Sequence, residues 1–211
     1  MKPITLRQYL LFGVGTLFNA LGISILTKAY LGTSPISSLP FVLSLGLPLS
    51  FGVFTFLFNM LFLIGQLLIL RKKFPPIQFL QIPVTIAFSL FLDLLRYLFR
   101  SIKPDNYLLS LVLLLTGCAV MAFGIVLSIR AEFLMTPADA FVRALSGLHG
   151  YSFGRVKVVF DTALMVLAVI CSFSLFGTFR GVREGTLMSS ILVGNLITFY
   201  QYILPKLFPK F

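Results

Sequence analysis

The sequence predicts an all-α integral membrane protein whose six transmembrane helices form two inverted three-helix repeats, each with a short extra helix between its first and second spans. Three observations predict this fold class. The chain is 58% hydrophobic and only 11% charged, with a mean hydropathy of +1.03, whereas soluble domains carry about a quarter charged residues. It contains six apolar runs of the length that crosses a bilayer, about 20 residues. It also matches itself after a shift of 102 positions.

The apolar runs define one membrane domain, residues 1–211. The second run, FGVFTFLFNMLFLIGQLLIL, is the most clearly bounded, because a basic segment (71–73) and two prolines follow it. The third contains Pro83, a residue that packed neighbouring helices tolerate in a membrane span. The six predicted spans cover residues 8–29, 51–70, 78–98, 107–129, 153–176 and 185–204.

The basic residues predict the orientation. With the N-terminus inside, eleven of the 17 lysines and arginines lie on the inner side and six on the outer side. Cytoplasmic loops carry the excess of Lys and Arg, so we expect both termini in the cytoplasm. The net charge of +11 does not indicate nucleic acid, because no soluble domain presents a basic patch. The inner set is Lys2, Arg7, Arg71, Lys72, Lys73, Arg130, Arg143, Arg155, Lys157, Lys206 and Lys210.

An internal repeat predicts how the six spans are arranged. Residues 20–59 align without gaps on residues 122–161, and glycines, hydroxyl-proline pairs, basic residues and a Ser-Phe-Gly triplet coincide. Apolar composition alone does not produce such matches. Residues 8–100 form repeat 1 and residues 107–204 form repeat 2. Because each repeat holds three spans, the second enters from the opposite side, an architecture characteristic of secondary transporters.

A short segment connects the first and second spans of each repeat. LGTSPISSLPFVLSLG (31–46) and LMTPADAFVRALSGLHG (134–150) each contain a hydroxyl residue followed by proline, at Ser34 and Thr136. An N-cap with proline at the first helical position is a helix-start signal, and a nearby glycine suits the C-cap. We expect a short helix of about two to three turns in each segment.

Two interpretations of these short helices stay open. They are half-helices whose N-termini point into a cavity and favour a polar or anionic group, or they are interfacial helices at the two membrane surfaces. Asp139 and Arg143 favour the second interpretation for the second helix, because an i,i+4 charge pair is typical of a wetted face.

Asp161 is the most informative single residue. It lies about nine residues into its span, which corresponds to roughly 13 Å of depth, and Lys157 lies one turn earlier on the same face. A charge at that depth usually marks a pathway or relay, and the alternative is a structural ion pair between helices. Its repeat mate is Asn59, so the two polar groups are expected to face one central site.

Other residues complete the candidate set. Lys28 and Arg130 end the first span of each repeat, as snorkelling anchors or as a source of positive field near the hydroxyl-proline starts. Asp93 and Arg96 are expected to form a helix-end charge pair. The substrate-binding candidates are Ser34, Asn59, Thr136, Lys157, Asp161, Lys28 and Arg130.

Four glycines predict the packing of the first and fourth spans. Gly15 and Gly22, and their mates Gly117 and Gly124, recur at intervals of seven residues. Small residues on one face let helix backbones approach closely, so these spans are expected to cross at the centre of the bundle.

The missing motifs argue against an enzyme. His149 is the single histidine, so a Ser-His-Asp triad or a histidine metal cluster has almost nothing to build with. The chain has no phosphate-binding loop and no GxSxG elbow. We therefore expect no enzyme activity, no catalytic residue, no metal and no cofactor.

Two stretches resemble a known family. GISILTKAYLGTSPISSL followed by LSFG, and the later GVREGTLMSSILVGNLI, are similar to the YczE/YyaS/YitT group of small bacterial membrane proteins. The resemblance covers most of the chain and implies a bacterial plasma-membrane protein with six spans, without implying a mechanism. Repeat 2 departs from the pattern, with Leu134-Met135 where Gly-Thr is expected.

The leading functional hypothesis is a small transporter or permease for a polar or anionic solute, with its site between the two repeats. Its partners are then the lipid bilayer and a small-molecule solute. The alternatives are a substrate-capture subunit that needs an energising partner, and a non-transporting scaffold or accessory protein. Homo-oligomerisation and a partner subunit both stay open.

Overall fold

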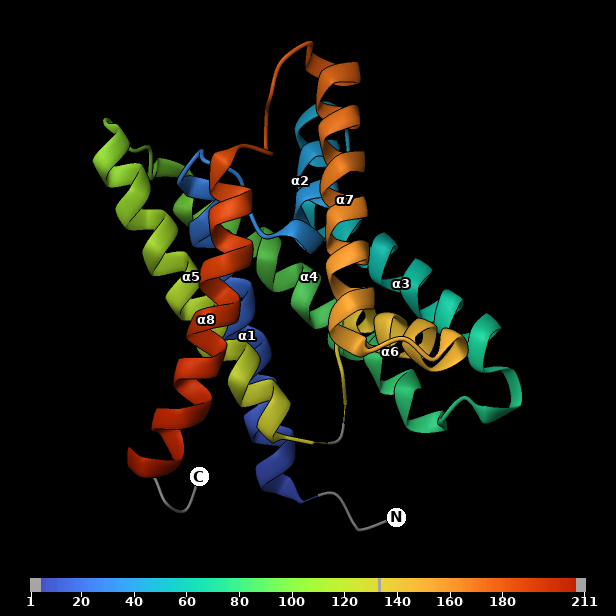
Figure 1. Cartoon of the computed structure of the whole chain (residues 1–211). Helices are drawn as coiled ribbons and strands as arrows, with labels where there is room; N and C mark the ends of the chain where they lie inside the picture. Colours follow the sequence, from blue (N-terminus) through green and yellow to red (C-terminus); the bar gives the residue numbers. More distant parts are fainter. Residues whose placement is uncertain (1–4, 133, 208–211) are drawn as a thin grey trace.

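A computed structural model describes residues 5–132 and 134–207, and these are helical apart from short connections (Figure 1). Lys2 and Lys210, which count toward the predicted inner side, lie outside the described residues. Short 3-10 turns flank α4 at Arg71–Lys73, Pro76–Leu80 and Phe99–Ser101. The α-helices are α1 (Leu6–Lys28), α2 (Pro35–Gly46), α3 (Phe51–Leu70), α4 (Gln81–Leu98), α5 (Tyr107–Arg130), α6 (Pro137–His149), α7 (Phe153–Phe176) and α8 (Glu184–Leu207).

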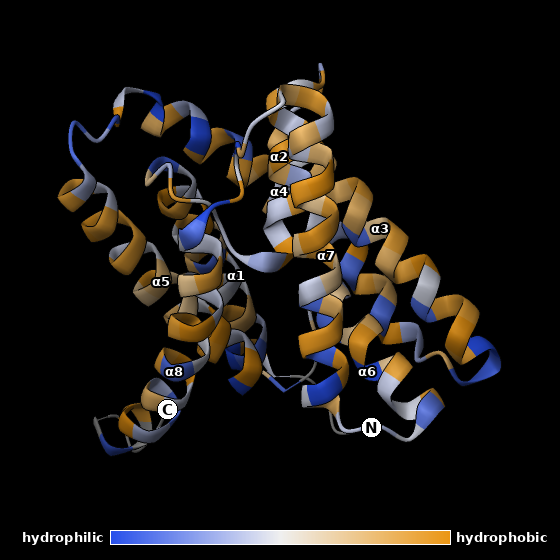
Figure 2. Cartoon of the chain, turned by 45° about the horizontal axis from the view of Figure 1, so that its top comes forward, coloured by the Kyte–Doolittle hydropathy of each residue, from blue (hydrophilic) through white to orange (hydrophobic). Residues whose placement is uncertain are grey.

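The predicted spans and short helices are confirmed. In the described part of the chain, α1, α3, α4, α5, α7 and α8 are long and apolar enough to cross a membrane. Figure 2 shows hydrophobic residues along these helices and hydrophilic residues concentrated toward their ends and the connecting loops. The two short helices begin where the hydroxyl-proline signal places them, with Ser34 and Thr136 as N-caps.

The helix ends bear out the capping prediction in one of the two short helices. Gly150 ends α6 in the left-handed conformation, at φ +69°, which glycine adopts without a steric penalty. After Gly46, however, α2 continues into extended chain at Leu47, so this glycine is the last helical residue and not a left-handed cap.

The glycine-rich faces of α1 and α5 are in direct contact, as predicted. A Cβ atom on Gly22 would lie 2.4 Å from the backbone nitrogen of Met121, and one on Gly124 would lie 2.4 Å from that of Asn19. These two helices and α8 form one group of the fold, with a shared apolar core.

Helices α2, α3, α6 and α7 form a second group beside the first (Figures 1 and 2). Here α2 packs on α7 and α6 packs on α3. The side chains of Leu175 and Phe176 in α7 cover Gly46, and the ring of Phe141 in α6 covers Gly65 of α3. The two groups are joined by α4, which contacts both α1 and α3.

Asp93 has a different role from the predicted charge pair with Arg96. Its carboxylate accepts hydrogen bonds from the Ser50 hydroxyl and, at 2.8 Å, from the backbone N–H of Gly52. Asp93 therefore caps the start of α3 from α4, where negative charge is favourable. Arg96 instead donates to the Ser44 hydroxyl at 3.1 Å and lies 5.6 Å from the ring centroid of Phe41.

Candidate functional site

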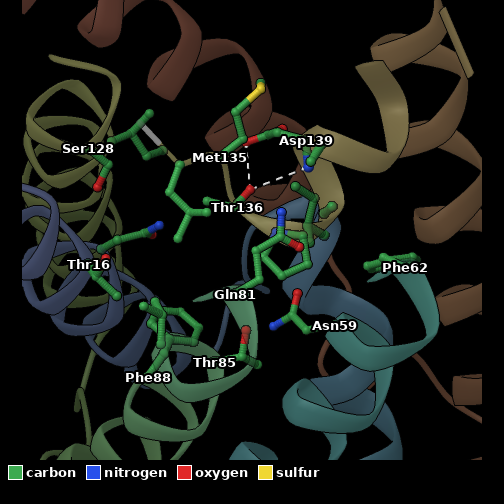
Figure 3. A pocket seen from close by; sticks show the side chains of 18 of the residues that line it. Thr16, Asn59, Phe62, Gln81, Thr85, Phe88, Ser128, Met135, Thr136 and Asp139 are labelled. Atoms are coloured by element: carbon green, nitrogen blue, oxygen red, sulfur yellow. Dashed lines mark hydrogen bonds between the residues drawn. The ribbon is translucent and has the colours of Figure 1, made fainter. Parts of the chain in front are cut away.

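A cavity of about 830 Å³ lies between the two helix groups (Figure 3). Its walls come from α1, α3, α4 and α5, and from the first two turns of α2 and α6. This volume is in the range of small-molecule sites, which are mostly apolar with a few placed polar groups. The polar residues on its wall include Thr16, Asn19, Ser34, Ser37, Asn59, Gln66, Gln78, Gln81, Thr85, Ser128, Thr136 and Asp139.

Both short helices begin at this cavity, since Ser34 and Thr136 line its wall. The two starts differ in chemistry. Ser34 makes no capping hydrogen bond and donates instead to the Ser37 hydroxyl at 3.0 Å, and the first turn of α2 has no acidic residue. The first N–H groups of a helix have no partner within the helix. The start of α2 therefore presents donors that its own N-cap side chain leaves free.

The start of α6 is closed by its own side chains (Figure 3). The Thr136 hydroxyl accepts from the backbone N–H of Asp139 at 3.3 Å and donates to the Asp139 carboxylate at 2.8 Å. A carboxylate in the first turn offsets the positive end of the helix dipole. The two helix starts therefore present different electrostatic surfaces to the same cavity.

A network of glutamine side chains joins three walls of the cavity. Gln66 of α3 and Gln81 of α4 are each 1% exposed. The Gln66 side chain donates to the carbonyl of Pro137 at 2.9 Å and to Gln81 Oε1 at 3.3 Å, and Gln81 donates to Gln78. The sequence-based reasoning missed this network, although both amides stand inside predicted spans and were visible as polar interruptions.

Replacing Gln66 by leucine is expected to lower the free energy of unfolding by about 1–3 kcal/mol, because the buried Pro137 carbonyl and the Gln81 amide lose a partner. The measurement is thermal unfolding of the purified protein in detergent. Gln201→Leu, on an exposed position of α8, is the matched control. Equal melting temperatures for the two variants would show that the network adds nothing to stability.

Lys157 joins two carboxylates beside the cavity. Its Nζ lies 3.0 Å from Asp161 Oδ1 and 3.0 Å from Asp139 Oδ1. The predicted Lys157–Asp161 pair is thus present. The expected Asp139–Arg143 pair is wrong, because Asp139 pairs with a residue of the next helix, while Arg143 donates to the sulfur of Met135 at 3.5 Å.

The remaining candidates occupy different places. Asn59 lines the cavity, and Asp161 and Lys157 do not. Asp161 is connected to the wall through Lys157 and Asp139. Lys28 and Arg130 are the last residues of α1 and α5 and do not line the cavity.

The loop before α2 is held against the start of α8. The backbone N–H of Gly185 donates to the Leu31 carbonyl at 2.8 Å, and the Ser189 hydroxyl donates to the Thr33 carbonyl at 3.1 Å. Gly32 has φ +114°, and a Cβ there would lie 2.2 Å from the Thr186 hydroxyl. The GTSP and GTLMSS stretches therefore meet in space, and their contact places Ser34 at the cavity.

A chain of six long apolar helices with a partly polar cavity between them is a multi-pass membrane protein. It belongs to a family of unknown function, DUF6198, whose model matches residues 6–202. It is 28% identical over 203 residues to the uncharacterized protein YyaS of Bacillus subtilis (strain 168), covering 95% of this chain and 96% of YyaS. It is 30% identical over 92 residues to the uncharacterized membrane protein YczE of the same organism, covering 43% of this chain and 40% of YczE. No solved structure matches the chain.

Proposed function

We propose that this protein is a small-solute transporter or permease of the bacterial plasma membrane, without enzyme activity, whose substrate binds in the cavity between the two helix groups. One observation carries the proposal. Ser34 and Thr136, separated by 102 positions (136 − 34), start the two short helices, and both line the same cavity. Broken helices whose starts meet at a central site are a feature of secondary transporters.

Reciprocal packing supports two inverted repeats, residues 8–100 and 107–204. The short helix of the first repeat packs on the second span of the other, in the pair α2 and α7, and the converse holds for α6 and α3. The first spans of both repeats cross at their matching glycines. An exchange of this kind places the cavity between two helix groups, each of which contains helices of both repeats. Such groups can rock against each other.

The lining favours a small solute with at least one polar group. The open start of α2 supplies backbone donors for a polar or anionic group, and Asn59 supplies an amide on the facing helix α3. Asn19 Oδ1 is buried without a hydrogen-bond partner in the described structure, so the cavity also offers an acceptor. The large apolar share of the wall suits the rest of such a molecule.

Residues Ser34 and Asn59 provide the test of the site. Full-length protein in vesicles is screened against a solute panel by thermal shift, and any hit is followed by uptake. Ser34→Ala and Asn59→Leu are each expected to raise the Kd of a hit about tenfold, a loss of about 1.4 kcal/mol in binding free energy. Ser190→Ala, which changes an exposed serine of α8, is the matched control.

Two outcomes would contradict the proposal. A hit that stabilises both variants as strongly as the unmodified protein would place the site elsewhere. The absence of any hit, together with a partner protein recovered on mild extraction, would favour the scaffold or the substrate-capture subunit. Uptake that requires the recovered partner would distinguish the capture subunit from the scaffold.

Orientation is part of the same proposal, with both termini in the cytoplasm, as the distribution of Lys and Arg favours. The exposed segment Arg71–Lys73 at the end of α3 then faces the cytoplasm. The substitution Lys72→Cys, made in a variant without Cys118 and Cys171, provides a thiol in this segment. It should react with a membrane-impermeant thiol reagent only after the membrane is permeabilised.

A further inference from the structure

The charged group beside the cavity contains more negative than positive charges. Lys157 contacts Asp139 of α6 and Asp161 of its own helix, with its Nζ 3.0 Å from an oxygen of each. One ammonium thus stands between two carboxylates. The exposed fractions of these side chains are 24% for Lys157, 30% for Asp139 and 24% for Asp161, so most of each side chain is covered by protein.

The neighbouring helices do not supply a compensating charge. The elements packed against α6 and α7 are α3 and α2, and neither contains an ionisable residue. Arg143 of α6 carries a positive charge and lines the cavity, but its guanidinium lies against the sulfur of Met135, and Arg155 of α7 is exposed. Glu132, also on the cavity wall, carries one negative charge against the one positive charge of Arg143, so these two do not balance the group.

A net negative charge is costly inside a membrane, and transporters commonly use such carboxylates to carry protons. Binding one proton would leave one ammonium facing one carboxylate, which balances the group. Two interacting carboxylates hold such a proton jointly, so it belongs to the pair and not to either residue alone.

We propose that Asp139, Lys157 and Asp161 form a proton-binding site that couples solute transport to the proton gradient. This inference rests on the proposed transport function and names its coupling ion. The proton comes from cavity water and adds to a carboxylate oxygen of the pair formed by Asp139 and Asp161, which share it. Asp139 is the member of the group that lines the cavity. Lys157 keeps its own protons throughout, so one ammonium faces one remaining carboxylate charge.

The same step changes the cavity wall. While the shared proton resides on Asp139, its carboxyl group accepts less strongly from the Thr136 hydroxyl, which is 2.8 Å away, and does not offset the dipole at the start of α6. Proton binding therefore makes the second helix start more attractive to a polar or anionic group. Proton and solute then favour each other's binding, which is the linkage that proton-coupled uptake needs.

The test measures the proton itself. Infrared titration of full-length protein in lipid nanodiscs, from acidic to mildly alkaline pH, follows the carbonyl band of protonated carboxyl groups. In the unmodified protein we expect a band that titrates above the pH range of exposed carboxyl groups. This band should be lost in both Asp139→Asn and Asp161→Asn, since either change leaves a balanced pair. Glu184→Gln, which removes a carboxylate paired with Arg183 at the protein surface, should leave the band unchanged.

The outcomes are decisive without a known solute. A titrating band that persists unchanged in both asparagine variants, or that is absent from the unmodified protein, overturns the proton site. Circular dichroism of each variant verifies its helical fold. If the solute panel finds no ligand but the band is lost as expected, transport fails while the proton site stands. If a ligand is found whose affinity does not depend on pH, coupling fails while transport stands.

Discussion

Gly124→Ala is expected to lower the free energy of unfolding by about 3 kcal/mol, at the upper end of the usual cost of overpacking. The added Cβ would lie 2.4 Å from the backbone nitrogen of Asn19 and 2.6 Å from the carbonyl oxygen of Gly15. Both atoms belong to the backbone of α1, so no side-chain rotation relieves the clash and the two helices must separate. The measurement is thermal unfolding in detergent.

Gly13→Ala provides the matched control, because it makes the same substitution in α1 where an added Cβ meets nothing within 4 Å. There the helix propensity of alanine should raise stability by about 1 kcal/mol. Opposite signs for the two substitutions are expected. A Gly124→Ala protein as stable as Gly13→Ala would show that the close crossing of α1 and α5 is not required.

Lys157→Met is expected to have a comparable effect, with a loss of about 3 kcal/mol, because removing one partner of a largely covered ion pair leaves charge uncompensated. Here two carboxylates, those of Asp139 and Asp161, lose their shared ammonium. Adding Asp161→Asn to the Lys157→Met variant should recover part of the loss. Lys72→Met, on an exposed position, is the control and should change stability little.

A double-mutant cycle on Lys157 and Asp161 measures the interaction free energy between the two side chains directly. If the effects of Lys157→Met and Asp161→Asn simply add, the two side chains do not stabilise each other. A Lys157→Met protein that unfolds at the same temperature as the Lys72→Met control would likewise contradict the role assigned to this ammonium.

Tightly packed glycines and ion-pair partners differ in how far they could be predicted from sequence. The seven-residue spacing of glycines on α1 and α5 is a property of each helix, so it identified the contact face correctly. The partner of Asp139 was predicted wrongly, because the i,i+4 rule sees only residues of the same helix. Lys157 comes from α7, and the turn at Gly150 brings it into contact.

The sequence shows which polar residues interrupt the apolar runs, but it does not show which partners they bond. Gln66 and Gln81 interrupt apolar runs 15 residues apart, and nothing local indicates that they bond each other and the Pro137 carbonyl. The same holds for Asp93. Its predicted partner was Arg96 of the same helix, but its carboxylate caps the start of α3. These partners depend on which helices become neighbours.

The sequence by itself determined the six spans, the two short helices with their starts at Ser34 and Thr136, and the glycine faces. Hydropathy, capping and helical spacing are local properties, and a bilayer requires each span to satisfy its own backbone. Only the tertiary structure decided that both starts line one cavity and that Asp161 reaches it through Lys157 and Asp139. Those relations join residues of different helices, and they exist only once packing has set the helices side by side.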